Sequence, residues 1–237
     1  MNNNRRLYYP AVLYAASLLL LWLLSWVMGV AGLLMGNEAL SRSLVSAEGV
    51  RWAVRSASAS LDEAPWATIM LIVLSVGLLS GSGMVKSAAG MLRRRAMSIN
   101  EKRAWLFALP AAVTCLLLLF AATVSPWNML LGVTGNFYTS PLLQGWVFVA
   151  FLIVLFVTSV YGYIYGNYRS LPDIARSMGA ACSFYAPALL AVVPATGIVP
   201  CIGYMGLLPQ GDNLAVFADV LYLLPFVYVT LLRIARV

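Results

Sequence analysis

The sequence predicts an all-α fold: a polytopic membrane helical bundle of about six transmembrane helices, with one short amphipathic helix and one Pro-broken segment. The first observation is the composition, because 62% of the 237 residues are hydrophobic and only 10% are charged, with a mean hydropathy of +0.88. The second is a series of long apolar stretches, and the third is the uneven distribution of Lys and Arg around them. A water-soluble domain rarely carries so little charge, so the solvent for most of this chain is a bilayer.

Six apolar stretches are long enough to cross about 30 Å of hydrocarbon as helices. They run over 10–35, 65–85, 104–124, 142–165, 178–199 and 214–232. Helices are expected because a span must satisfy its own backbone hydrogen bonds, and the sequence lacks the alternation typical of barrel strands. The first stretch is too long for the apolar region of a signal peptide, so we interpret it as a retained span within a single membrane domain, 1–237.

The basic residues predict the orientation of these spans. Four segments on one side carry most of them: Arg5, Arg6, Lys86, Arg93, Arg94, Arg95, Lys102, Arg103, Arg169, Arg176, Arg233 and Arg236. The other side carries Arg42, Arg51 and Arg55. Cytoplasmic loops are enriched in Lys and Arg, so we expect both termini in the cytoplasm of a bacterial cell and the chain in its cytoplasmic membrane.

Two further segments are not simple spans. The segment 48–61 alternates apolar side chains with Arg and Ser, and it follows a helix-start pattern at Ser46. We expect it to lie on the outer membrane surface as a short amphipathic helix. In 187–209, the prolines Pro187, Pro194 and Pro200 interrupt an apolar run. This predicts a break or re-entrant piece that could line a substrate path; the alternative is a Pro-kinked helix packed on its neighbours.

Composition also excludes several kinds of function. The chain has no His, and its three Cys lie in apolar runs, which argues against a Cys/His metal site and against a disulfide framework. No phosphate-binding loop or nucleophile–base pattern is present in the sequence, so we predict no enzyme activity, no metal and no cofactor. The net charge of +7 reports membrane topology, and nucleic acid is not an expected partner.

Asp219 is the candidate ion-coupling residue, because it falls within the last apolar stretch. An acid at membrane depth is a candidate cation or proton site. The alternative is an interfacial Asp near a helix N-terminus, where the helix dipole favours a negative charge. Both interpretations remain open at this point.

Gly162 and Gly166 are four residues apart near the end of the fourth stretch, within VYGYIYGNY (160–168). Small residues at this spacing let helices approach closely, either inside one chain or at a dimer face. The surrounding tyrosines predict an aromatic belt at the inner membrane interface. The lipid bilayer is therefore one expected partner, and a homodimer or a separate membrane subunit is another.

Several stretches, taken in order, resemble the p-aminobenzoyl-glutamate transporter (AbgT) family. They are EGVRW (48–52), AP (64–65) with LSVGLLSGSGMV (74–85), SP (140–141) before a span ending in GYIYG (162–166), and RSLPDIARSMGAACSFYAPALLAV (169–192). The resemblance implies an elevator-type transporter: a dimer with a scaffold part and a moving part that contains two re-entrant hairpins. Members are considerably longer, and the hairpin regions have no counterpart in this sequence. The family's Asn- and Ser-containing stretch has become VPCIGYMGLL (199–208).

This resemblance gives two functional hypotheses. The first is an AbgT-like membrane transporter, or a remnant of one, that moves a small organic anion or an antimetabolite by ion-coupled exchange. Its substrate path would include Gly162, Gly166, Pro187, Pro194 and Pro200, with Asp219 for ion coupling. The alternative is a non-transporting membrane scaffold, or a subunit of a larger complex.

Overall fold

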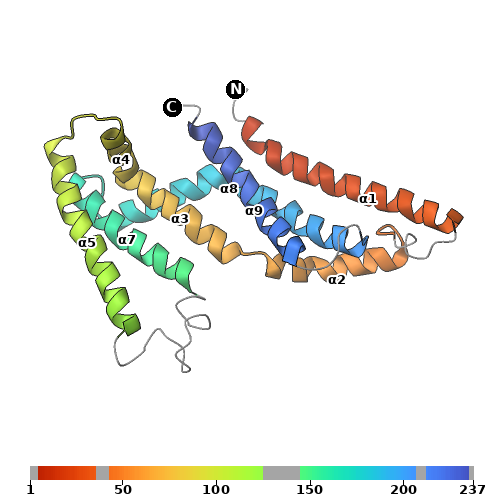
Figure 1. Cartoon of the computed structure of the whole chain (residues 1–237). Coiled ribbons are helices and arrows are strands. Elements are labelled where there is room, and N and C mark those ends of the chain that lie inside the picture. Colours follow the sequence, from red (N-terminus) through yellow and green to blue (C-terminus); the bar gives the residue numbers. More distant parts are fainter. Residues whose placement is uncertain (1–4, 36–42, 125–144, 207–211, 235–237) are drawn as a thin grey trace. The chain divides into compact units, whose positions relative to one another are not determined.

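The computed structural model describes residues 5–35, 43–124, 145–206 and 212–234, and these are almost entirely helical (Figure 1). A 3₁₀ turn, η1 (Arg5–Tyr8), leads into the first long helix. The α-helices are α1 (Tyr9–Met35), α2 (Ala47–Glu63), α3 (Trp66–Ser82), α4 (Met84–Leu92), α5 (Ile99–Val124), α7 (Trp146–Tyr165), α8 (Leu171–Tyr204) and α9 (Asp212–Ile234).

Four of these helices, α1, α5, α7 and α8, are long and apolar enough to cross a membrane. A fifth span exists only if α2 and α3 together form one broken span, and the apolar part of α9, Val216–Leu232, is shorter. The all-α membrane bundle is therefore confirmed, whereas six spans remain a prediction. The boundaries of α1, α5 and α9 agree closely with the sequence-based spans.

The helices divide into two compact units. The central unit comprises Trp66–Phe184, and the terminal unit comprises Met1–Pro65 with Tyr185–Val237. Helix α8 begins in the central unit and continues into the terminal unit. The two units are described separately below.

In the central unit, α5 and α7 share an apolar core. Its buried members are Ala104 and Ala108 of α5 with Val157 and Tyr161 of α7. Trp105 meets the ring of Tyr161 edge-on at 5.6 Å, and its indole N–H donates to Ser87 Oγ of α4 at 3.0 Å. The short helix α4 lies where the sequence predicted only a basic loop, and this hydrogen bond ties it to α5.

Small residues make the contact between α3 and the first half of α8. A Cβ built on Gly77 would lie 2.7 Å from the backbone oxygen of Ser177 and 2.8 Å from the Cβ of Ala181. One turn later, a Cβ on Gly81 would overlap the side chain of Ser177. Gly77 and Gly81 thus form a GxxxG pair that meets a Ser-x-x-x-Ala pair, and the two backbones approach without intervening side chains.

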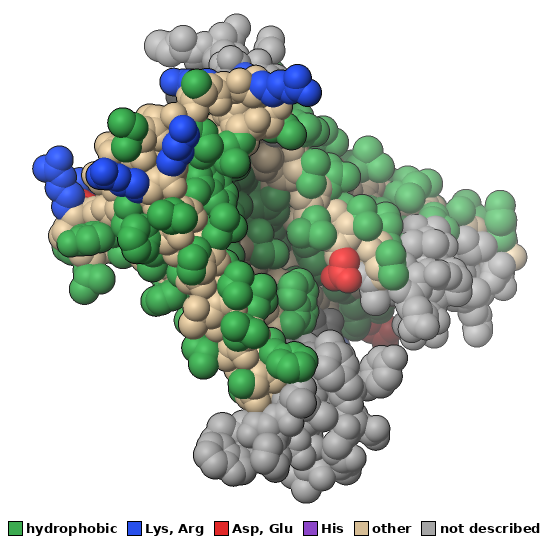
Figure 2. Space-filling model, turned by 60° about the vertical axis from the view of Figure 1, so that its left-hand side comes forward, with side chains coloured by type: hydrophobic (Ala, Val, Ile, Leu, Met, Phe, Trp, Pro, Cys, Tyr) green, Lys and Arg blue, Asp and Glu red, His purple; other side chains and the backbone are tan. Residues whose placement is uncertain are grey.

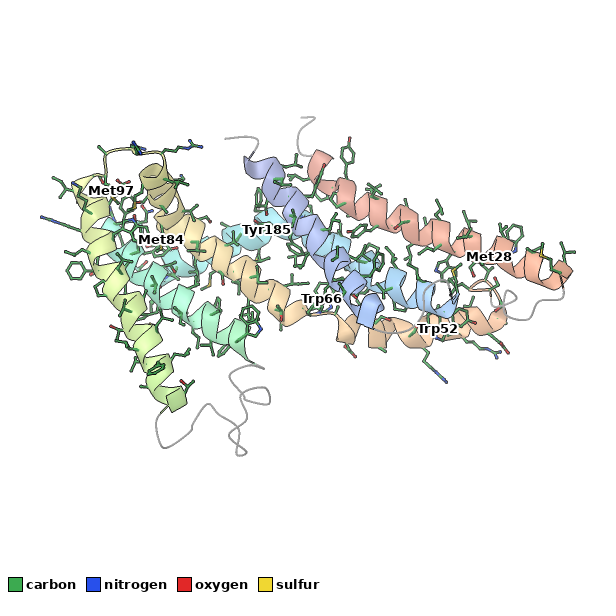
Figure 3. The ribbon with its side chains drawn as sticks, viewed as in Figure 1. Met28, Trp52, Trp66, Met84, Met97 and Tyr185 are labelled. Carbon is green, nitrogen blue, oxygen red and sulfur yellow. The ribbon has the colours of Figure 1, made fainter. Side chains whose placement is uncertain are left out.

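In the terminal unit, α2 begins where the sequence predicts. Ser46 is its N-cap, and its side chain accepts from the backbone N–H of Gly49 at 3.0 Å. The ring of Trp52 stacks on Tyr204 at the end of α8, 4.3 Å between centroids, so one face of α2 packs on protein. Met28 of α1 belongs to the same cluster (Figure 3).

The turn before α2 is anchored in α1. The buried hydroxyl oxygen of Ser25 accepts from the backbone N–H of Leu44 at 2.6 Å, and both residues are fully buried. Leu44 also packs with Cys201 and Met205 at the end of α8. A buried backbone donor is thereby satisfied by a side chain, as a water-free interior requires.

A proline in α9 creates the link between the first and last helices. Pro225 has no N–H, so the carbonyl of Leu221, four residues earlier, loses its helical donor. The hydroxyl of Tyr14 on α1 donates to this carbonyl at 3.0 Å. A neighbouring helix therefore satisfies the group that the proline released, as is expected inside a membrane.

The break predicted for 187–209 is wrong over the residues that the structure describes, whereas the alternative, one helix that contains the prolines, agrees with the structure there. Helix α8 runs without interruption through Pro187, Pro194 and Pro200 to Tyr204, and residues 207–209 lie outside the described part. The side chains of Ala188, Ala191 and Ala195, which lie among these prolines on α8, are buried. We attribute the continuity of the helix to the packing that buries them.

Two basic segments of the central unit lie at the same end. The side-chain amide of Asn167, in the α7–α8 connection, donates to the carbonyls of Gly81 and Ser82 at 3.2 and 2.9 Å. The connection that carries Arg169 therefore lies beside the start of α4, which carries Lys86. Figure 2 shows Lys and Arg gathered at one end of the visible face, while hydrophobic side chains cover the helix flanks.

Candidate functional site

Gly162 and Gly166, the two glycines predicted for the substrate path, have different physical roles. A Cβ on Gly162 would overlap the aromatic ring of Tyr168, which folds back onto α7 at this point. Gly166 has open space around it, but its φ of 95° lies in the left-handed region and it ends α7 as the C-cap. Gly162 thus makes room for a ring, and Gly166 allows the chain to turn.

Replacing Gly166 with alanine should cost roughly 1–2 kcal/mol of unfolding free energy, because an L side chain strains the left-handed conformation. No neighbouring atom crowds the added methyl group, so the whole loss of unfolding free energy comes from the strained backbone conformation. The Tm of the purified chain in detergent measures it. Gly166→Asn should lose less, since Asn adopts this conformation more readily. Identical Tm values for the Ala variant and the wild type would contradict this account.

The predicted tyrosine belt is wrong for two of its members. Tyr161 is fully buried in the α5–α7 core, and Tyr168 is 4% exposed. The hydroxyl of Tyr168 donates to the carbonyl of Leu78 at 3.0 Å and lies 2.9 Å from Ser177 Oγ. Burial raises the pKa of Tyr168, so this hydroxyl stays protonated as a donor at neutral pH. Only Tyr163, 71% exposed, has the exposure that a belt requires.

The remaining path candidates belong to the terminal unit, whereas the two glycines belong to the central unit. Pro187 is buried, and Pro194 and Pro200 are partly buried within α8. Asp219 is exposed on α9, and its neighbours Val216 and Val220 are 61% and 53% exposed. Asp219 lies seven residues after the first residue of α9, which places it about 10 Å along the helix. The path that would join all six residues remains a prediction.

Several hydroxyls in the described spans donate to carbonyls of their own helices, whereas the buried hydroxyl of Tyr161 has no hydrogen-bond partner among the described residues. Thr158 donates to the carbonyl of Val154 at 2.6 Å, Ser159 to that of Leu155 at 2.6 Å, and Thr196 to that of Val193 at 2.8 Å. Such bonds satisfy a hydroxyl without creating a site that faces a solute. Within the described residues, no group of three or more His, Cys, Asp or Glu side chains could hold a metal ion.

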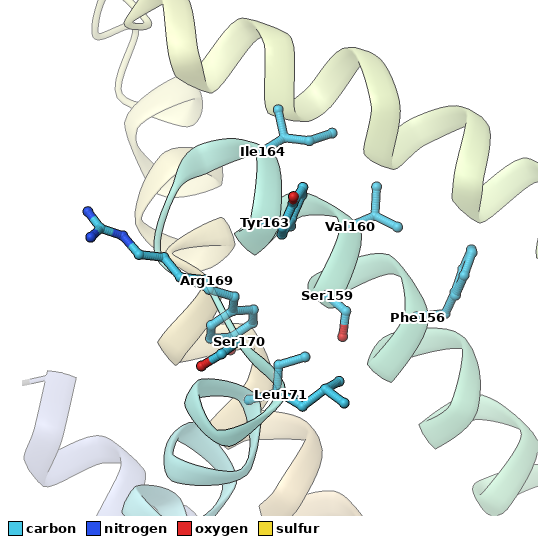
Figure 4. Close-up of a pocket in the computed structure, with 10 residues that line it drawn as sticks. Phe156, Ser159, Val160, Tyr163, Ile164, Arg169, Ser170 and Leu171 are labelled. Carbon is cyan, nitrogen blue, oxygen red and sulfur yellow. The ribbon is translucent and has the colours of Figure 1, made fainter.

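One apolar groove of the central unit lies between α7 and the start of α8 (Figure 4). Two adjoining cavities, of about 480 and 530 Å³, share four lining residues: Phe156, Ser159, Leu171 and Ile174. We call this the α7–α8 groove. Leu152 lines one end, and Tyr168, Arg169 and Ser170 line the other.

Sequence reasoning missed the α7–α8 groove. Its α7 residues fall on the predicted span 142–165, but of its α8 residues only Met178 falls on the predicted span 178–199, because α8 begins earlier, at Leu171. A hydrophobic stretch identifies a span but does not show where two spans diverge. A smaller cavity of about 430 Å³ lies between α1 and α9 and is lined by residues such as Tyr9, Leu13, Leu224 and Tyr228.

Comparison of the chain with protein-family models, with curated proteins and with solved structures gives no match. The class of protein therefore rests on the fold itself. Several helices have the length and apolarity of membrane spans, and long apolar side chains such as Leu19, Leu23, Leu117 and Phe120 are more than 60% exposed along them. These features define an all-helical integral membrane protein.

Proposed function

We propose that the chain is a membrane-embedded scaffold related to AbgT-type transporters, which holds a partner and does not itself transport. The partner would be a second copy of the chain or a separate membrane subunit. The observation that carries the proposal is that hydroxyls within the spans donate to carbonyls of their own helices, as described above for Thr158, Ser159 and Thr196. A solute site needs convergent polar groups that remain free to contact a ligand.

The resemblance supports the same proposal. The longer matching stretches fall mainly on α2, α3, α7 and α8, and SP (140–141) lies outside the described residues. The hairpin regions that would move substrate have no counterpart in the sequence. Rigid small-residue packing of α3 on α8, through Gly77 and Gly81, suits a scaffold better than a moving part. We further propose that the scaffold lies in a bacterial cytoplasmic membrane with both termini in the cytoplasm, as its basic loops suggest.

The scaffold proposal predicts that the purified full chain in a mild detergent is not a lone monomer. Size-exclusion chromatography with light scattering should give the mass of a homodimer or of a complex with a co-purified membrane subunit. A mass equal to one chain, 25.7 kDa after correction for detergent, would contradict it.

Independent transport of a small organic anion is the second candidate, and Asp219 favours it. This carboxylate lies on an otherwise apolar part of α9, where an uncompensated charge is costly unless it has a function. Proteoliposomes that contain the full chain would be tested for uptake of p-aminobenzoyl-glutamate. The scaffold proposal predicts no uptake. Uptake that is lost in Asp219→Asn, and kept in the control Asp62→Asn on α2, would overturn it and establish a transporter.

A further inference from the structure

The α7–α8 groove has the length of one membrane leaflet. On α7 its lining residues extend from Leu152 to Ile164, a distance of about 18 Å at 1.5 Å per residue. The hydrocarbon of one leaflet is about 15 Å deep, half of the bilayer core. The groove begins about one third of the way along α7 and reaches the end of that helix, so its length suits one extended hydrocarbon chain.

The walls of the groove are apolar over most of this length. Leu152, Leu155 and Phe156 of α7 contribute to them, and Ile174 and Met178 of α8 lie on the other wall. Ser159 is the polar side chain in the middle, and its hydroxyl donates to the carbonyl of Leu155. The interior therefore offers dispersion contacts to a hydrocarbon and little that would hold a polar solute.

The mouth of the groove is polar and positively charged. Arg169 and Ser170 are both exposed there, and Arg169 extends outward from the mouth (Figure 4). Asp173 is the nearest acid along the chain, and its carboxylate accepts hydrogen bonds from the backbone N–H groups of Arg169 and Ser170, each at 3.1 Å. The connection also lies beside the start of α4, so Lys86 adds positive charge at this end of the unit.

We propose that the α7–α8 groove binds one acyl chain of an anionic phospholipid, with Arg169 contacting the headgroup phosphate. The apolar walls take the hydrocarbon, and the guanidinium provides paired N–H donors for phosphate oxygens. The proposed lipid binding does not depend on the proposed scaffold function. It uses only residues that line the α7–α8 groove in the central unit, and it requires no protein partner. It also gives the basic end of the unit a preference for anionic lipid over zwitterionic lipid.

Native mass spectrometry of the full chain in detergent tests the proposal, with phosphatidylglycerol and phosphatidylcholine of identical acyl chains as probes. The wild type should retain phosphatidylglycerol preferentially. Arg169→Gln should reduce that preference about fivefold, the effect expected for one basic side chain near a membrane surface. The matched control Arg176→Gln removes an exposed Arg of α8 that does not line the groove, and it should keep most of the preference. Equal retention of the two lipids by the wild type, or an unchanged preference in Arg169→Gln, would overturn the proposal.

A second pair of variants tests the groove itself. Ala175 lines the groove and is exposed, so Ala175→Phe should fill the groove and reduce retention of both lipids without disturbing the core. Ala180→Phe places the same ring at an exposed position of α8 outside the groove and should have no effect. Excess glycerol phosphate should not displace the lipid. Displacement by glycerol phosphate, or equal lipid retention in the two Phe variants, would show that the groove does not hold an acyl chain.

Discussion

The Gly77→Leu variant is expected to lose about 3 kcal/mol of unfolding free energy, at the upper end of the usual range for overpacking. Even a methyl group at this position would lie 2.7 Å from the backbone oxygen of Ser177 and 3.1 Å from the Cα of Met178. Backbone atoms cannot rotate away as a flexible side chain can, so α3 and α8 must separate. Unfolding of the purified chain by SDS in mixed micelles, followed by circular dichroism, measures the loss.

Gly179 provides the matched control. It lies on α8, only two residues from Ser177, but it is exposed and no atom lies within 4 Å of a Cβ built there. Gly179→Leu therefore tests the same substitution without the close contact, and it should be neutral or slightly stabilising because Leu favours helix more than Gly does. Equal losses in the two variants would show that the GxxxG contact of α3 is not what holds these helices together.

The Gly162→Ala variant should lose about 2 kcal/mol, because the new methyl group and the ring of Tyr168 cannot occupy the same space. If the ring moves away, its hydroxyl also loses the carbonyl of Leu78 and the side chain of Ser177. Two hydrogen bonds and the ring packing are thus lost with a single methyl group. The same SDS unfolding measurement applies.

A double-mutant cycle separates this mechanism from a general intolerance of side chains at position 162. In a Tyr168→Ala background the space beside Gly162 is free, so adding Ala at 162 should cost little. The two substitutions should therefore be far from additive, with a coupling energy of about 1–3 kcal/mol, the range seen for residues in direct contact. Additive effects would mean that the Tyr168 ring does not determine the need for glycine at 162.

Sequence patterns predicted the helices well, for reasons that are local. A long apolar run such as 10–35 must be helical in a bilayer, and Ser46 before an amphipathic segment is sufficient to place the start of α2. The break expected at Pro187, Pro194 and Pro200 did not occur, because the effect of a proline on a helix depends on how that helix is packed, and this part of α8 is largely buried. Tertiary packing therefore decided an element for which local propensity was misleading.

The candidate site was harder to predict than the helices. Gly162 and Gly166 were identified as a pair by their spacing, yet one accommodates a ring from the following connection and the other terminates a helix. The sequence contained an equally good GxxxG pair, Gly77 and Gly81, whose partner on α8 is about a hundred residues away in the chain. Neither that contact nor the α7–α8 groove follows from spacing alone, because both depend on which helices become neighbours.

The hydrogen bond from Tyr14 to the carbonyl that Pro225 releases in α9 has a consequence for synthesis of the protein. The two partners are separated by 207 residues, so at about 5–20 residues per second the ribosome needs about 10–40 s to deliver the second one. The central unit ends at Phe184 and can assemble earlier. The part of α1 around Tyr14 therefore lacks its α9 partner until that helix emerges, and a chain truncated before α9 would leave this part of α1 uncovered.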